Sequence, residues 1–459
     1  MNKIRFYAAL WVGKLTRAVM LLLGRNATYF PGVVALKICP KFLLHVGKPK
    51  TVVSITGTNG KTTTVNLACD LLEHSGRRIL HNRLGSNINS GIATALMLGC
   101  NLSGRSKYDI AVFETDERSV KRIYPFVTPT HILITNLFRD SIMRNAHCEY
   151  ISGFLTDGIP PQSLLILNAD DPVSFRVAPE NKRVYFGIEK MVSDTIECIN
   201  LLNDVRICPI CRGSLEYEYR RYHHIGKFHC TQCDFKTPEY NYSASNIDFV
   251  AQTLRISDKD EEYVYNLVSD SIFNIYNVVS VVALLRELGL SHSEIAAAMS
   301  KTNIMASRYR NDQEGDIRVV MQLSKAINAL AITRAFDYVS SRPGRKQLLV
   351  LTNDLGDEAE CSESICWMYD CDFEYLNKPD ISRIVVAGPR VKDLYFRLLL
   401  AGVPKEKLRC DRDELKTPEM FDYEEKSDIY ILHGLDSYAV GLKARDKIAE
   451  YARAAAGSK

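Results

Sequence analysis

The amino-acid sequence predicts an α/β fold built on a mostly parallel sheet. Its 459 residues, 46% of them hydrophobic, give room for about three domains with separate cores. Apolar runs of strand length alternate with helical stretches, and three of these runs cover residues 110–113, 131–135 and 164–167. Buried strands separated by helices are typical of parallel sheets, which bind ligands at the carboxyl ends of their strands.

A loop rich in glycine and threonine is the most informative part of the chain. It follows the apolar run 51–53, precedes a helix-like stretch over 65–72, and reads Ser54-Ile55-Thr56-Gly57-Thr58-Asn59-Gly60-Lys61-Thr62-Thr63-Thr64. A strand, a loop and a helix in this order form the usual setting of a phosphate-binding loop.

Each residue type in this loop has a role in binding a nucleoside triphosphate. Gly57 and Gly60 let backbone N–H groups turn toward the phosphates, and Lys61 brings a positive charge to the outer phosphates. The hydroxyl of Thr62 or Thr63 can reach Mg²⁺. The loop therefore predicts ATP and Mg²⁺ as ligands.

The form of the loop indicates a superfamily. The general pattern places a glycine five residues before Gly60, where this chain has Ile55. The shorter Gly-Thr-Asn-Gly-Lys-Thr-Thr sequence resembles the Mur ligase and folylpolyglutamate synthase superfamily. The resemblance implies nucleotide contacts along the whole loop, from Gly57, Thr58, Asn59, Gly60, Lys61, Thr62 and Thr63.

Charge and hydropathy exclude several classes of protein. A net charge of +4 without blocks of like charge does not indicate a nucleic-acid-binding protein. The apolar segment 8–23 is interrupted by Lys14 and Arg17 and has no small-residue cleavage site, so we expect neither a signal peptide nor a membrane span. We therefore expect a cytoplasmic protein.

Two interpretations of this segment remain open. Basic residues lie in and around it, which suits a helix on the inner face of the membrane; they are Lys3, Arg5, Lys14, Arg17 and Arg25. A helix packed on the next domain is the favoured alternative.

Cysteine spacing predicts a zinc site. The chain has 13 cysteines, and four of them form two C-x-x-C pairs separated by 18 residues: Cys208, Cys211, Cys230 and Cys233. This spacing is typical of a structural four-thiolate Zn²⁺ site in a zinc ribbon. Four thiolates leave no open position for water, so we expect the metal to hold a small insertion together, and we do not expect His223, His224 or His229 to be ligands.

Polar residues follow two of the predicted strands. Glu114 and its acidic neighbours follow the strand at 110–113, and Asn136, Arg139 and Asp140 follow the strand at 131–135. Carboxylate oxygens are ligands that Mg²⁺ prefers. We therefore expect these side chains to line the site of the outer phosphates.

Further segments carry the resemblance to the Mur ligases. Residues 167–172, Leu-Asn-Ala-Asp-Asp-Pro, look like a characteristic segment of these enzymes. Residues 273–277 resemble the helix start on the adenine side, which implies a nucleotide contact from Asn277. Arg308 stands near the position of a Gly-Arg segment, with Ser307 in place of the glycine.

The four-cysteine insertion and the C-terminal part of the chain indicate one family within this superfamily. Together with segments 353–354, 367–374 and 387–393, the insertion resembles the MurT family of lipid II isoglutaminyl synthase subunits. The resemblance implies ATP-dependent amidation of the D-glutamate α-carboxylate of the peptidoglycan stem peptide on lipid II. It also implies an acyl phosphate intermediate, ammonia from a GatD-type glutamine amidotransferase partner, and Mg²⁺ held by Thr62 and Glu114.

The resemblance also implies that an aspartate of this chain completes the catalytic triad of the partner. The segment 353–364 departs from the family pattern and is longer, so its alignment leaves two candidates for this aspartate. Asp357 is the first candidate and Asp354 the second. Lys325 is retained where the family has Lys-Asn-Pro-x-Gly, without the proline and the glycine.

These observations predict a Mur ligase-like nucleotide-binding domain over 49–312 with a zinc ribbon inserted at 205–236. An N-terminal segment, 1–48, precedes this domain, and a MurT-type α/β domain follows over 316–459. Two other functions remain open: a stand-alone ligase that joins an amino acid to a carboxylate, and a nucleotide-binding scaffold without catalysis.

Overall fold

The computed structural model describes residues 2–83, 86–140, 147–267, 271–302, 310–314, 317–324, 328–351, 365–434 and 436–457. The chain forms two compact units, which are described separately. The first comprises Met1–Phe138, His147–Cys198 and Asp204–Asn303, and the second comprises Arg139–Ala146, Ile199–Asn203 and Ile304–Lys459. The N-terminal segment therefore belongs to the first unit, and two short stretches of the middle of the chain belong to the second.

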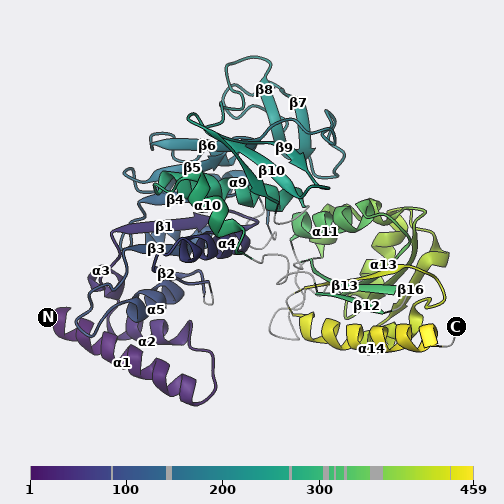
Figure 1. Ribbon diagram of the computed structural model, residues 1–459, viewed down its shortest axis with the longest axis horizontal. Helices are drawn as coiled ribbons and strands as arrows, with labels where there is room; N and C mark the ends of the chain where they lie inside the picture. The colour runs from purple at the N-terminus through teal and green to yellow at the C-terminus, as the bar shows by residue number, and fades with distance from the viewer. Residues whose placement is uncertain are drawn as a thin grey trace. The chain divides into compact units, whose positions relative to one another are not determined.

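A nine-stranded sheet with the order β11-β10-β9-β6-β5-β4-β1-β3-β2 forms the centre of the first unit (Figure 1). Neighbouring strands are parallel from β2 to β9, and β10 and β11 are antiparallel additions at one edge. The mostly parallel sheet is confirmed, including its three predicted strands. The strands are β1 (Thr51–Thr56), β2 (Ile79–His81), β3 (Ile110–Glu114), β4 (His131–Ile134), β5 (Leu164–Asn168), β6 (Arg183–Ile188), β9 (Tyr242–Asp248), β10 (Thr253–Ser257) and β11 (Glu262–Asn266).

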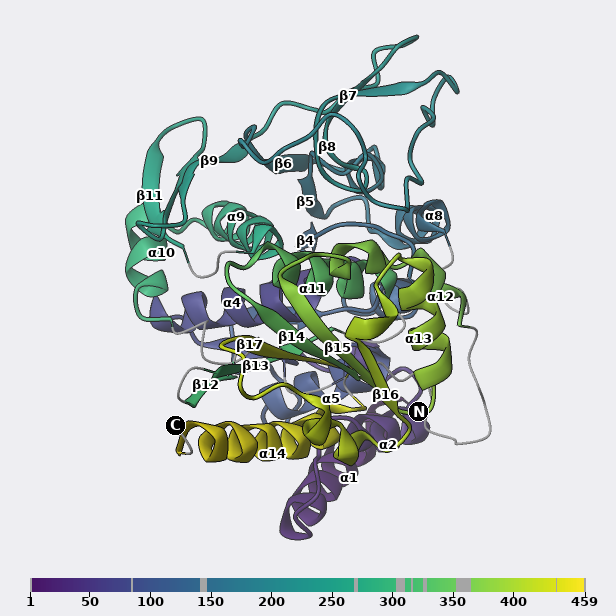
Figure 2. The ribbon, with the colours of Figure 1, turned by 90° about the vertical axis from the view of Figure 1, so that its right-hand side faces the viewer.

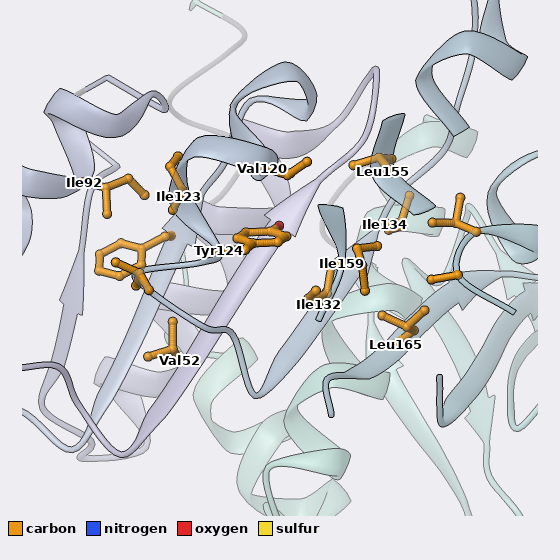
Figure 3. Close-up of a cluster of buried hydrophobic side chains, with 14 of the residues drawn as sticks. Val52, Ile92, Val120, Ile123, Tyr124, Ile132, Ile134, Leu155, Ile159 and Leu165 are labelled. Atoms are coloured by element: carbon orange, nitrogen blue, oxygen red, sulfur yellow. The ribbon is translucent and has the colours of Figure 1, made fainter. Parts of the chain in front are cut away.

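Helices cover both faces of this sheet, which explains why its central strands β1, β3, β4 and β5 are buried along most of their length. One face packs against the helices α4 (Lys61–His74), α9 (Ile272–Glu287) and α10 (His292–Met299). The other packs against α5 (Asn89–Gly99), η1 (Glu117–Ser119), α6 (Val120–Ile123) and α8 (Cys148–Gly158). In the core on this second face, Tyr124 lies over β1 and Ile159 lies beside Ile132 (Figure 3).

Three N-terminal helices extend this second core. They are α1 (Asn2–Leu22), α2 (Phe30–Ile38) and α3 (Phe42–His45). Phe6, Ala9 and Leu10 of α1 are buried against α2, α3 and α5, so one side of α1 is packed as the favoured interpretation expects. Within the described part of the chain, no helix is long and apolar enough to cross a membrane.

The predicted ribbon is a separate two-stranded antiparallel hairpin of β7 (Leu215–Tyr222) and β8 (Ile225–Cys230). Its aromatic side chains Tyr217 and Phe228 are buried and join the core of the first unit together with the partly buried Phe175 of η2 (Ser174–Arg176). The insertion is therefore packed onto the nucleotide-binding domain.

The second unit is also an α/β structure, seen from its side in Figure 2. Its six strands have the order β12-β13-β17-β14-β15-β16 and are parallel except for β12. They are β12 (Arg310–Glu314), β13 (Ile317–Leu323), β14 (Lys346–Leu351), β15 (Ile381–Ala387), β16 (Leu408–Asp411) and β17 (Asp428–His433).

Two apolar clusters lie on the two faces of this second sheet. One involves α11 (Ala329–Ser341), α12 (Cys366–Asp370), η4 (Phe373–Leu376) and α13 (Val391–Leu400). The other involves α14 (Tyr438–Gly457) and η6 (Glu414–Met420); η5 (Lys405–Lys407) precedes β16. The predicted C-terminal α/β domain is therefore present.

Candidate nucleotide site and zinc ribbon

The glycine-rich loop has the backbone of a phosphate-binding loop. It joins the end of β1 to the start of α4, where the first N–H groups of the helix have no partner within the helix. Gly57 and Gly60 have φ angles of +126° and +86°. A Cβ atom at Gly60 would lie 2.5 Å from Oδ1 of Asn277, and one at Gly57 would lie 2.4 Å from Oγ1 of Thr135. Both positions therefore require glycine.

The end of β4 holds the tip of the loop. The backbone N–H of Thr58 donates to the carbonyl of Asn136 at 2.8 Å. The amide side chain of Asn136 binds the backbone of Asn59 twice, accepting from its N–H and donating to its carbonyl at 3.1 Å each. Thr135 Oγ1 donates to the same carbonyl at 2.7 Å. In this arrangement Asn136 shapes the loop.

Lys61 is held at the mouth of the loop by an acidic residue. Its Nζ lies 2.8 Å from Oε1 of Glu117 and also donates to the carbonyl of Gly57. The side chain of Glu117 is only 5% exposed. Glu117 lies in the acidic run after β3, but the sequence did not single it out as a site residue.

Glu114 stands at the carboxyl end of β3, opposite Ile55 of β1. Asn82 holds its backbone with two hydrogen bonds of 2.8 and 2.9 Å, and Asn87 Nδ2 donates to its carboxylate at 3.2 Å. The carboxylate is therefore oriented at the edge of the sheet where the loop begins.

Oxygen donors and unpaired polar atoms at the loop fit a nucleotide with Mg²⁺. Thr62, at the start of α4, is exposed. The buried Oγ1 of Thr63 and Nδ2 of Asn59 have no hydrogen-bond partner among the described residues. Buried polar groups normally have partners, and the Glu114 carboxylate with threonine hydroxyls supplies the hard oxygen ligands that Mg²⁺ prefers.

Four further predicted site residues lie outside the loop, and the structure describes three of them. Asn277 is buried on α9 beside the loop, where its Oδ1 accepts from Thr64 Oγ1 at 3.2 Å. Arg139 belongs to the second unit and lies 3.2 Å from Asp370. Asp140 accepts a hydrogen bond from Asn328 Nδ2 at 3.1 Å in the same unit. Arg308 lies outside the described residues.

The four predicted cysteines come together. Their sulfur atoms all lie within 4.8 Å of one another, so the cluster could hold a metal ion; its members are Cys208, Cys211, Cys230 and Cys233. The backbone N–H groups of Ile210 and Gly213 point at sulfurs of the first pair at 3.4 Å. Such donors stabilise thiolates, and four thiolates gathered at one point fit Zn²⁺, which takes four such ligands in structural sites. No histidine belongs to this cluster in the described part of the chain.

The tip of the ribbon hairpin reaches the loop through Phe138. The rings of His224 and Phe138 are stacked with their centroids 4.2 Å apart. Nε2 of His224 lies 3.3 Å from Oδ1 of Asp171. The backbone N–H of Phe138 donates to Thr58 Oγ1 at 3.0 Å, and its carbonyl accepts from the same hydroxyl at 3.2 Å. Phe138 thus links the ribbon to the loop, since it contacts His224 with its ring and Thr58 with its backbone.

Comparisons with known proteins agree with this geometry. A model of the Mur ligase middle domain matches residues 55–208, and a model of the MurT ligase C-terminal domain matches residues 323–437. The lipid II isoglutaminyl synthase (glutamine-hydrolyzing) subunit MurT of Staphylococcus aureus (strain COL) is 32% identical over 92% of this chain and 93% of that protein. The chain belongs to the MurT family.

Another member of the MurT family supports this assignment, and a solved structure supports the fold. The MurT subunit of Streptococcus pneumoniae is 29% identical over 96% of both chains. The structure of a pseudomurein peptide ligase type C from Methanothermus fervidus superposes with a TM-score of 0.66 at 21% identity. It covers 90% of this chain and 81% of that one. The Mur ligase-like fold is therefore confirmed.

The Asp-Asp pair of the Mur ligase-like segment 167–172 anchors the ribbon in this MurT chain. Asp170 is fully buried and accepts hydrogen bonds of 2.6 Å from the hydroxyls of Tyr240 and Tyr276. Arg221 of β7 lies 3.3 Å from Asp170 and 2.8 Å from Asp194, with 3% of its side chain exposed. Burial raises the pKa of Tyr276 well above its ordinary value, so its hydroxyl remains a donor.

The aspartates predicted to serve the partner, Asp354 and Asp357, lie outside the described residues, as does Lys325. The segment that begins at residue 365 lies in the second unit. Trp367 and Phe373 are buried in the core of the second unit, and Asp372 accepts hydrogen bonds from Leu201 N at 2.6 Å and Asn200 Nδ2 at 3.0 Å.

Proposed function

We propose that this chain is the ATP-dependent ligase subunit of a lipid II isoglutaminyl synthase. It converts the α-carboxylate of D-glutamate in the stem peptide of lipid II to the amide of D-isoglutamine. The observation that carries this proposal is 32% identity over 92% of the chain to a subunit of that name. The loop from Gly57 to Lys61, built as a phosphate-binding loop, supports it independently.

The chemistry follows from the poor reactivity of a carboxylate. A carboxylate oxygen attacks the γ-phosphorus of ATP, ADP leaves, and an acyl phosphate forms. Ammonia then attacks the acyl carbon, the C–O bond to phosphate breaks, and loss of a proton leaves the amide. The protein's main contributions are positioning and electrostatic stabilisation.

Particular residues supply these contributions. Backbone N–H groups at Gly60 and the start of α4 bind phosphate oxygens, and Lys61 neutralises charge on the outer phosphates. Glu117 and Glu114 orient the groups around them through the contacts described above. Thr62 and Glu114 would hold Mg²⁺, which neutralises further phosphate charge.

We assign zinc a structural role. Four cysteine thiolates close its coordination shell, so the ion holds the ribbon together and takes no part in the reaction. The hairpin of β7 and β8 in turn positions Phe138, because His224 at its turn stacks on the ring of Phe138.

Ammonia comes from a GatD-type glutamine amidotransferase, to which this chain contributes an aspartate, Asp357 or Asp354. The chain itself shows no cysteine–histidine signature of a glutaminase. Because the substrate is linked to a lipid, we place the reaction in the cytoplasm at the inner face of the membrane.

The test uses the purified chain with lipid II in detergent, ATP, Mg²⁺ and ammonium. Mass spectrometry of the lipid should show conversion of one carboxylate to an amide. Lys61→Ala should abolish product, whereas Lys121→Ala should not, because Lys121 is exposed and pairs with Asp157 of α8.

Other outcomes would overturn the proposal. ATP hydrolysis that requires an added amino acid would indicate a stand-alone ligase. Tight ATP binding without turnover, also in the presence of a co-purified glutaminase, would indicate a scaffold.

A further inference from the structure

Helix α1 has an apolar face that the described structure leaves exposed. One side of the helix is packed through Phe6 and Leu10. The opposite side carries large apolar residues at helical spacing, with Ile4 81%, Leu15 64% and Leu22 87% exposed. The exposed apolar residues of the helix and its end, here called the outer face of α1, are Ile4, Trp11, Val12, Leu15, Val19, Leu21, Leu22 and Leu23.

An exposed apolar surface of this kind marks an interaction site. A surface helix normally has one apolar side that faces the core and a polar side that faces water, whereas α1 is apolar on its packed side and on its outer face. Here α2 and α5 lie between α1 and the sheet, and α1 lies at the edge of the first unit (Figure 1).

The charge of the N-terminal segment that carries this face indicates the chemistry of its partner. Residues 1–50 contain nine lysines and arginines and no aspartate or glutamate, although the whole chain has a net charge of only +4. The basic residues are Lys3, Arg5, Lys14, Arg17, Arg25, Lys37, Lys41, Lys48 and Lys50. The partner is therefore expected to be anionic.

We infer that the outer face of α1 docks on an anionic lipid bilayer. Its apolar side chains enter the boundary between headgroups and acyl chains, and the basic residues bind anionic headgroups. Trp11, 55% exposed on this face, is of the residue type that is enriched at membrane interfaces. The helix lies on the bilayer and does not cross it.

A second copy of the chain fits this face less well. A two-fold symmetric dimer brings the same surface of both copies together. Two N-terminal segments that each carry nine basic and no acidic residues over positions 1–50 would repel each other. A bilayer of anionic lipid offers acyl chains to the apolar side chains of the outer face and negative charge to the basic residues.

This inference rests on the proposed function for its biological purpose, because docking would bring the chain to a lipid-linked substrate. The binding itself does not require that substrate. Its failure and the failure of the proposed function are therefore distinguishable.

The experiment measures binding of the full chain to vesicles of phosphatidylglycerol and phosphatidylcholine, without lipid II or ATP. We expect co-sedimentation with anionic vesicles that weakens with salt, and little with phosphatidylcholine alone. The chain has two tryptophans, and Trp367 is 3% exposed. Binding should therefore shift the emission of Trp11 to shorter wavelength, and Trp11→Phe should remove this shift.

A double variant and a control variant test whether the outer face of α1 is the part of the chain that binds the vesicles. Leu15→Glu combined with Leu22→Glu should weaken vesicle binding about ten-fold or more, since each replaces an apolar side chain with an anion. Val250→Glu is the matched control, because Val250 is 96% exposed on the loop between β9 and β10 and is not part of this face. The Leu15/Leu22 variant should still amidate lipid II in detergent, which keeps the catalytic function as a separate measurement.

Equal binding by the wild type and the Leu15/Leu22 variant would overturn the inference. So would a wild-type dimer in light scattering that this variant dissociates, because the face would then be covered by a second copy. Binding to neutral and anionic vesicles alike would overturn the role of the basic residues.

Discussion

The imidazole of His224 is stacked on the phenyl ring of Phe138, with the ring planes inclined by 23°. His224 lies at the turn of the ribbon hairpin between β7 and β8, and Phe138 binds the hydroxyl of Thr58 through both its backbone groups. A change in the ribbon can therefore displace Thr58 in the phosphate-binding loop without altering any residue of the loop.

We expect His224→Ala to weaken ATP binding roughly two- to ten-fold, because aromatic pairs contribute about 0.5–1.5 kcal/mol beyond their buried area. Isothermal titration with ATP and Mg²⁺ measures the change. His229→Ala is the matched control, since the side chain of His229 is 48% exposed in the same hairpin. Identical ATP affinities for both variants and the wild type would show that the ribbon does not position the loop.

The sequence predicted the parts of this molecule that depend on local pattern. Strands β3, β4 and β5 follow from apolar runs, and the loop and the cysteine cluster follow from spacing within short segments. Such patterns are short-range and directly visible in one sequence.

Long-range pairs left no comparable signal. Lys61 and Glu117, which form an ion pair, are 56 residues apart in sequence. The sequence predicted no role for His224 and indicated only that it should not bind zinc. Arg139 follows β4 as predicted, yet it pairs with Asp370 in the second unit, because the chain leaves the first unit directly after Phe138. Only the folded chain brings such residues together.

The buried contact between Arg221 and Asp170 should be important for stability. Arg221→Met leaves Asp170 and Asp194 without their cationic partner in a nearly water-free site. Breaking a buried ion pair on one side costs about 3–5 kcal/mol. Urea unfolding followed by circular dichroism should show this loss.

A surface ion pair is the control for that measurement. Arg255 pairs with Glu262 between β10 and β11, and its side chain is 40% exposed. Arg255→Met should cost about 0–1 kcal/mol. A similarly small effect of Arg221→Met would mean that the tyrosine hydroxyls alone satisfy Asp170.

Removal of one cysteine should release zinc and loosen the ribbon. In Cys230→Ser the four-sulfur cluster loses one ligand, and a chelator should have the same effect on the wild type. Elemental analysis should give about one zinc ion per wild-type chain and less in the variant, together with a lower melting temperature. Cys366→Ser is the control, since Cys366 is exposed and lies outside the cluster. Protein purified without chelators and free of zinc would contradict the assignment.

We expect the carboxylate of Asp357 to orient the catalytic histidine of a glutaminase partner, as the third residue of a triad does. Asp357→Asn should impair glutamine-driven amidation strongly and spare ammonia-driven amidation, because the phosphate-binding loop is untouched. Removal of such a carboxylate in another triad lowers kcat about 10⁴-fold. Asp354→Asn is the matched comparison in the same acidic segment. Both rates are measured on lipid II with the partner present, using glutamine or ammonium as the nitrogen source. A selective loss in the Asp354 variant would transfer the role to that residue, and unchanged glutamine-driven rates in both would mean that the partner receives no carboxylate from either position.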